Sequence, residues 1–296
     1  MRTRFGAAAL CAVTAFGCAG SAKQDRAAEM ELRLIRSATT EITYGDGDGS
    51  VTLLVDPIVA DQGTEEPIFF SNDKKIPMIP LPVDKHRLIG SIDAVLITHD
   101  HPDHFDKEAE RILPKDTLIF CQPYDEEGLR KKGFTNLKVV VDEVSWRGIV
   151  ISRFPASHYP GATGAPPFGE SSSYLLRTKN DSMFITGDAI LDEKLKASIE
   201  KSRPNVIVAN TGECQFSKPN PVLAPGVTMT LTRGELKEMV QTWPGSTVVA
   251  VHMDAINHCV LTKSALRDAM AAEISAGRLL VPNEGEVAIP ASVARP

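Results

Sequence analysis

The stretch that most constrains this chain is ITHDHPDHFD, at residues 97–106. It continues an apolar run at residues 94–98 and then carries four side chains that can bind a metal, namely His99, His101, Asp103 and His104. Imidazole nitrogens and carboxylate oxygens suit divalent ions such as zinc, manganese, iron or cobalt, and the end of a strand holds such ligands rigidly. On extended backbone, His99 and His101 can point the same way toward one ion. Asp103 and His104 lie past the following turn and can reach a second ion, so the stretch predicts a two-metal centre.

Other candidate ligands also follow predicted strands. Strands are expected at residues 51–55, 148–154, 182–186 and 247–251. The polar residues at or just beyond their ends are Asp56, His158, Asp188 and His252. Because strand ends on one edge of a sheet converge in space, we expect these segments and residues 97–106 to line a single cleft. Five of the seven histidines of the chain fall in this set.

Strands are expected to dominate the first part of the chain, and strands mixed with helices the rest. Residues 31–37 and 51–55 are predicted to pair as a hairpin around a glycine and aspartate turn at residues 45–49. The last helix is expected at residues 263–276. This order is typical of helices that cover paired sheets.

Three irregular, proline- or glycine-containing loops are expected to supply the substrate contacts, at residues 58–92, 159–169 and 210–227. Thr232 and Glu235 have the spacing of a capping box that begins a helix. The aromatic residues near these segments, Phe154, Phe168 and Trp243, are predicted to belong to the core.

The order of the candidate ligands resembles the metallo-β-lactamase fold superfamily. The HxHxDH motif at residues 99–104 is followed by His158, Asp188 and His252, and preceded by Asp56 at the end of an early strand. The resemblance covers residues 31–282 and implies an α+β fold, a four-layer αββα sandwich with the site at one edge. Within the superfamily, the THxHxDH strand end and VHMDAINHC at residues 251–259 are similar to metal-dependent hydrolases related to L-ascorbate 6-phosphate lactonase.

The resemblance also implies how the ligands divide between two ions. The residues expected to bind the first ion are His99, His101 and His158, and those expected to bind the second are Asp103, His104 and His252. Asp188 would bridge the two ions. Zinc or manganese is expected, and iron is compatible with the same oxygen-rich set. Asp56 and Thr98 are expected to support these ligands, with ordinary turn capping as the alternative.

The implied reaction is hydrolysis. Two cations lower the pKa of a water between them toward neutrality, so hydroxide is available as a nucleophile. Asp103 would hold this nucleophile, and His258 would protonate a leaving group, unless His258 is a hydrogen-bonded core histidine. The substrate is expected to be a small molecule with an ester-type bond, and a lactone is the favoured class. A phosphodiesterase, or an exported metal-binding protein without turnover, are the alternatives. Because Asp188 stands where a cysteine occurs in some true β-lactamases, antibiotic hydrolysis is disfavoured.

Composition limits the partners and the domain organisation. The chain has 296 residues, 43% hydrophobic and 24% charged, and a net charge of −6, which gives no broad basic face for nucleic acid. Residues 29–296 are expected to form the hydrolase domain. Residues 1–28 have the order of a signal peptide, with Arg2 and Arg4 before an apolar stretch and small residues. The protein is therefore predicted to be exported to the periplasm or beyond, with Cys18 a candidate lipid anchor. A cytoplasmic protein with a disordered leader is the alternative, and the sequence does not specify an oligomeric state.

Three cysteines lie beyond the leader, namely Cys121, Cys214 and Cys259. Their number is odd and no CxxC spacing occurs, so they are predicted to be unpaired, buried residues.

Overall fold

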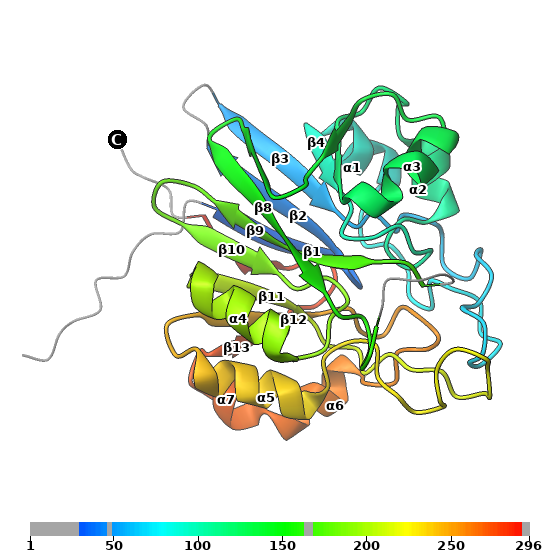
Figure 1. Cartoon of the computed structure of the whole chain (residues 1–296), viewed down its shortest axis with the longest axis vertical. Coiled ribbons are helices and arrows are strands. Elements are labelled where there is room, and N and C mark those ends of the chain that lie inside the picture. The colour runs from blue at the N-terminus through cyan, green and yellow to red at the C-terminus, as the bar shows by residue number, and fades with distance from the viewer. Residues whose placement is uncertain (1–29, 46–48, 163–167, 292–296) are drawn as a thin grey trace, which may run out of the picture.

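The computed structural model describes residues 30–45, 49–162 and 168–291. The predicted leader and the candidate lipid anchor Cys18 lie outside these residues. Two seven-stranded sheets pack face to face, with α1 to α3 on one outer side and α4 to α7 on the other (Figure 1). No helix within the described part of the chain is both long and apolar enough to cross a membrane.

The first sheet has the strand order β14-β1-β2-β3-β4-β5-β6. Its strands are β1 Met30–Arg36, β2 Thr39–Gly45, β3 Ser50–Val55, β4 Ala94–Leu96, β5 Ile119–Cys121, β6 Leu137–Val139 and β14 Val287–Ile289. The predicted pairing of residues 31–37 with 51–55 is wrong, because β2 lies between them and is antiparallel to both β1 and β3. Ser37, with φ at 56°, makes the tight turn that lets β2 begin at once.

The second sheet has the strand order β13-β12-β11-β10-β9-β8-β7. Its strands are β7 Glu143–Trp146, β8 Ile149–Ala156, β9 Ser171–Arg177, β10 Ser182–Ile185, β11 Val206–Asn210, β12 Thr247–Val251 and β13 Leu279–Leu280. Strands β10 to β13 are parallel to one another, as are β3 to β6 in the first sheet. The carboxyl ends of several strands therefore meet at one edge, where the candidate ligands begin.

The helices are α1 Lys85–Gly90, α2 Lys107–Ile112, α3 Glu126–Lys131, α4 Glu193–Ser202, α5 Arg233–Thr242, α6 Lys263–Ala269 and α7 Ala271–Ser275, with a 3-10 turn at Pro123–Asp125. The predicted capping box is present, since Thr232 accepts from the Glu235 N–H and the Glu235 carboxylate accepts from the Thr232 N–H. The helix expected at residues 263–276 is interrupted at Met270, whose ψ of 31° is not helical.

Three apolar layers hold the elements together. One lies between the sheets and includes Leu32, Phe120, Tyr174 and Val249. A second packs α1, α2 and α3 on the first sheet, through Leu54, Leu88, Ala109 and Leu129. A third packs α4, α5 and α6 on the second sheet, through Phe184, Ile199, Leu236 and Leu266. The fold is thus the predicted α+β, four-layer αββα sandwich.

Candidate metal centre

The first group of candidate ligands comprises His99 and His101, which follow β4, and His158, which follows β8. One nitrogen from each ring lies within 4.8 Å of the others. His158 Nε2 is 3.4 Å from His101 Nδ1, and His99 Nε2 is buried without a hydrogen-bond partner. A buried nitrogen without a partner is costly in a protein interior, so this arrangement fits a cation between the three rings.

The second group comprises Asp103, His104, Asp188 and His252, all buried. His104 Nε2 and His252 Nε2 are 3.0 Å apart, and Asp103 Oδ2 is 3.7 Å from His252 Nε2. These residues come from both sheets, because His104 follows β4 whereas His252 directly follows β12. His252 has φ at 67°, in the left-handed region, which redirects the chain at the strand end.

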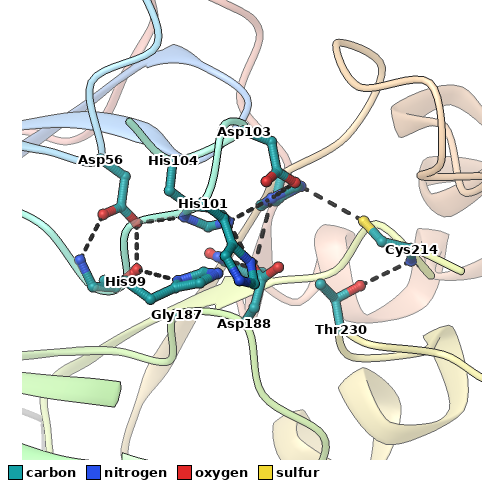
Figure 2. A network of polar contacts seen from close by, with 12 residues as sticks. Asp56, His99, His101, Asp103, His104, Gly187, Asp188, Cys214 and Thr230 are labelled. Carbon is teal, nitrogen blue, oxygen red and sulfur yellow. Dashed lines mark hydrogen bonds and ion pairs between the residues drawn. The ribbon is translucent and has the colours of Figure 1, made fainter. Parts of the chain in front are cut away.

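Asp188 lies between the two groups. Its Oδ1 is 3.2 Å from His104 Nε2, and its Oδ2 is 3.8 Å from His158 Nε2. The preceding Gly187 has φ at 57°, and a Cβ there would lie 2.6 Å from the Ser172 carbonyl oxygen, so only glycine fits. Figure 2 shows Asp188 and the histidine rings pointing toward one another. The structure thus brings all seven predicted ligands together, with Asp188 grouped with Asp103, His104 and His252. The bridging of two ions by Asp188 stays a prediction.

The donor set suits two divalent ions of the zinc, manganese or iron type, since it offers five imidazole nitrogens and two carboxylates. Burial lowers the pKa of His99, and lowers that of His101 to about 4, so both rings are neutral and able to coordinate. Burial also acts on His104, but Asp188 and Asp56 outweigh it and raise the pKa of His104 well above its usual value. A divalent ion would take the place of the proton that these carboxylates favour.

Asp56 contacts His104 of the second group on the side of the ring that faces away from the metal site. Its Oδ1 accepts from the Thr98 N–H at 2.7 Å. Its Oδ2 accepts from the Thr98 hydroxyl at 2.7 Å and lies 2.8 Å from His104 Nδ1. A carboxylate can only accept, so His104 carries its proton on Nδ1 and turns Nε2 toward the site. Asp56 and Thr98 therefore occupy the supporting positions predicted for them.

Backbone oxygens orient two further rings. His158 Nδ1 is 3.0 Å from the Met229 carbonyl oxygen, and His101 Nε2 is 2.7 Å from that of Phe168. Each carbonyl requires a proton on the facing nitrogen, which leaves His158 Nε2 and His101 Nδ1 free for an ion. Residue patterns could not reveal these contacts, because every residue type has a backbone carbonyl.

His258 lies beside the second group rather than within it. Its Nε2 is 3.7 Å from Asp103 Oδ2, too far for a hydrogen bond, and its Nδ1 is buried without a partner. Burial lowers the pKa of His258 to about 4, so the ring is neutral near pH 7. It is placed to contact a bound substrate, and its predicted role as an acid remains a prediction.

A pocket of about 250 Å³ opens over both groups. Its walls are formed by Ile68, Phe69, Asp100, Pro102, Phe168, Phe216 and Met229, and its floor by His101, Asp103, His158, Asp188 and His258. Each of the three predicted substrate loops contributes an aromatic ring, namely Phe69, Phe168 and Phe216. Phe168 was predicted in the core; it instead stacks on Phe216 with ring centres 5.7 Å apart, at the pocket wall.

The prediction of unpaired cysteines is wrong for two of the three. Cys214 and Cys259 form a disulfide, whereas Cys121 is free and buried in β5 as expected. The two partners are 45 residues apart and come from separate loops beyond β11 and β12. Only the tertiary fold brings them together, so their spacing gave no sign of the bond. Figure 2 places Cys214 on the side of the centre opposite Asp56.

Fold and site together define a metallo-β-lactamase-type sandwich with a candidate two-metal centre at its edge. Residues 52–253 match the family described as a beta-lactamase superfamily domain, and the chain therefore belongs to this family. The superfamily resemblance predicted from the HxHxDH motif is confirmed. The narrower resemblance to ascorbate-phosphate lactonases stays a prediction.

Three relatives are similar over nearly their whole length. UPF0173 protein YddR of Bacillus subtilis is 26% identical over 261 residues, which cover 87% of this chain and 98% of that protein. The crystal structure of a possible metal-dependent hydrolase from Veillonella parvula is 25% identical with a TM-score of 0.80, covering 89% of this chain and 100% of that chain. The crystal structure of isothiocyanate hydrolase from Delia radicum gut bacteria is 27% identical with a TM-score of 0.79, with the same coverages.

Proposed function

We propose that this metal-dependent hydrolase uses a dinuclear centre to attack an electrophilic carbon in a small, uncharged, apolar molecule. The substrate class that we propose first is a lactone. The observation that carries the proposal is the pocket, whose apolar walls end directly on both groups of candidate ligands. A volume of about 250 Å³ is below the usual range of pockets for drug-sized ligands. The pocket therefore favours a compact substrate, or the reactive end of a longer one.

The charges around the pocket argue against the phosphodiesterase alternative. No lysine or arginine is among the described residues that line it. The carboxylate of Asp100 is already paired with the Lys132 ammonium group. The two ions could receive one end of a phosphodiester, but the rest of this charged group would leave water for a wall of phenylalanine rings without a cationic side chain, which is costly. An uncharged substrate avoids this cost.

An isothiocyanate is the second candidate substrate class. The observation that favours it is the relative from Delia radicum gut bacteria, an isothiocyanate hydrolase by name, which aligns along its whole length with this chain. The central carbon of an isothiocyanate is electrophilic and the group is small and uncharged. These properties suit the same pocket as a lactone does.

When bound, the two ions supply a nucleophile at neutral pH and polarise the bond under attack. His99, His101 and His158 would hold one ion, and Asp103, His104 and His252 the other, with Asp188 between them. Phe168 and Phe216 exclude water from the pocket. Asp103 Oδ2 and His258 Nε2, 3.7 Å apart at the pocket floor, are the atoms placed to hold a proton on its way to the leaving group.

The test is hydrolysis of a panel by the full chain reconstituted with zinc or manganese. The panel contains a lactone, an alkyl isothiocyanate, an activated phosphodiester and a β-lactam. We expect turnover of the lactone or the isothiocyanate, and a loss of at least about 100-fold in the Asp103→Ala variant. Asp73→Asn is the matched control, because Asp73 is exposed and, among the described residues, pairs with Lys218 alone. Turnover of the phosphodiester alone would refute the substrate proposal. Two bound ions without any turnover would favour a metal-binding protein.

We also propose that the protein is exported. The disulfide supports this proposal, because disulfides persist in oxidising compartments. Fusing residues 1–28 to alkaline phosphatase, which is active only after export, tests the leader directly, and a Cys18→Ser fusion tests lipidation. An inactive fusion with residues 1–28 would support the cytoplasmic alternative.

A further inference from the structure

The candidate ligand histidines differ in the atoms that contact the outer ring nitrogen, the one turned away from the metal site. His104, His158, His101 and His99 each place their outer ring nitrogen near an oxygen atom, at distances between 2.7 and 3.1 Å. His252 does not follow this pattern. Its Nδ1 faces the two sulfur atoms of the disulfide, 3.7 Å from Cys214 Sγ and 3.5 Å from Cys259 Sγ.

The disulfide is buried and lies close to the backbone of Gly212. Cys214 is fully buried and Cys259 nearly so. A Cβ added to Gly212 would lie 2.5 Å from Cys214 Sγ, 3.0 Å from Cys259 Cβ and 2.4 Å from the His252 carbonyl oxygen. The sulfur pair therefore lies against the His252 ring, and Cys214 Sγ also lies so close to the Gly212 backbone that no side chain fits there.

The same region also supports the first group of ligands. The Met229 N–H donates to the Cys214 carbonyl oxygen at 2.7 Å, and the Met229 carbonyl oxygen is the partner of His158 Nδ1. The Cys214 N–H in turn donates to the Thr230 hydroxyl at 3.0 Å. These hydrogen bonds run through the Cys214 backbone and not through its sulfur, so a change at the sulfurs acts first on the rings beside them, of which His252 is the candidate ligand.

We infer that the Cys214–Cys259 disulfide positions His252, and that its reduction weakens metal binding at the second position. This inference rests on the proposed dinuclear centre. A dithiol reductant would transfer two electrons and two protons to the sulfur pair, giving two thiols and the oxidised, disulfide form of the reductant. Bonded sulfurs are about 2 Å apart, whereas two separate thiols need roughly the 3.5 Å of a non-bonded contact. Because Cys214 Sγ already lies close to the Gly212 backbone and both sulfurs lie against the His252 ring, separating the sulfurs displaces that ring.

The test compares metal affinities in both redox states of the full chain. The apo-protein is reduced with a dithiol, freed of the reductant under nitrogen, and titrated with Co²⁺ beside the oxidised protein. We expect two ions to bind the oxidised protein, and reduction to lower affinity for the second ion about 10- to 100-fold with the first unchanged. Re-oxidation should restore the second affinity, which a purely structural injury would not allow.

A Cys214→Ala/Cys259→Ala protein loses both sulfur contacts of the His252 ring, so its affinity for the second ion should be lower than that of the oxidised wild type and should no longer respond to the reductant. Cys121→Ala, which changes the unpaired cysteine of β5, is the matched control. If the double variant does not fold, the comparison of reduced with oxidised wild type still tests the inference. Equal second-ion affinities in both redox states would overturn the inference alone. So would a cobalt–thiolate absorption band in the reduced protein with both ions retained, because the sulfurs would then be ligands. Fewer than two ions in the oxidised protein would overturn the dinuclear centre as well.

Discussion

Replacing Asp56 by asparagine changes one atom behind the second group of ligands. The Thr98 N–H, 2.7 Å from Asp56 Oδ1, requires an acceptor there, so the asparagine carbonyl oxygen must take this place. The asparagine amino group then takes the place of Oδ2 and faces His104 Nδ1. A donor at this point favours the His104 tautomer with its proton on Nε2, the nitrogen that faces the metal site.

The magnitude follows from the contact that must be broken. To bind an ion through Nε2, His104 has to place its proton on Nδ1, facing the amino group without an acceptor. One buried donor left unpaired costs about 1–3 kcal/mol. We therefore expect affinity for the second ion to fall about 10- to 100-fold, which corresponds to roughly 1.4–2.8 kcal/mol. The free energy of unfolding of the apo-protein should change much less than it does in Asp56→Ala, which leaves both Thr98 donors unpaired.

Calorimetric titration of the apo-protein with Zn²⁺ measures the two affinities separately. Asp73→Asn makes the same chemical change on the surface and should bind both ions like the wild type. If Asp56→Asn is folded and keeps its second affinity within twofold, the reasoning about the His104 tautomer is refuted.

Three further outcomes follow from the structure. Phe216→Ala removes one wall of the pocket, and we expect KM for apolar substrates to rise about tenfold with kcat little changed, in steady-state kinetics. Burial raises the pKa of Asp125 to about 7, so the contribution of Asp125 to stability should fall as pH rises from about 4 to 7. Asp125→Asn should remove this loss, gaining about 4 kcal/mol relative to the wild type over that range in urea unfolding. Removing metal with a chelator should lower Tm. Where free metal had been at 100 times its Kd, the free energy of unfolding should fall by about 2.7 kcal/mol. An unchanged Tm would contradict a bound metal.

The sequence by itself determined the class of fold and the chemistry of the centre. The candidate ligands can be recognised in the sequence because histidine and aspartate follow short apolar strands. This pattern is local, so it can be recognised without knowing which strands pair with one another. His99, Asp188 and His252 were identified in this way, and parallel strands bring their ends to one edge whatever the loops do. Asp56 was recognisable for the same reason.

Only the tertiary structure decided which residues orient the candidate ligands and which residues form the pocket over them. The Cys214–Cys259 bond, the Met229 carbonyl and the pocket position of Phe168 depend on how irregular loops fold against one another. Such loops carry no hydrophobic period, and their contacts join residues far apart in the chain, so local pattern does not specify them. The position of β2 between β1 and β3 is not predicted by its sequence, because three of its seven residues are threonines, whose intermediate polarity obscures the alternation of buried and exposed positions. The identity of the candidate metal ligands is thus a local property of this sequence, whereas their orientation and the shape of the pocket arise from packing over long sequence separations.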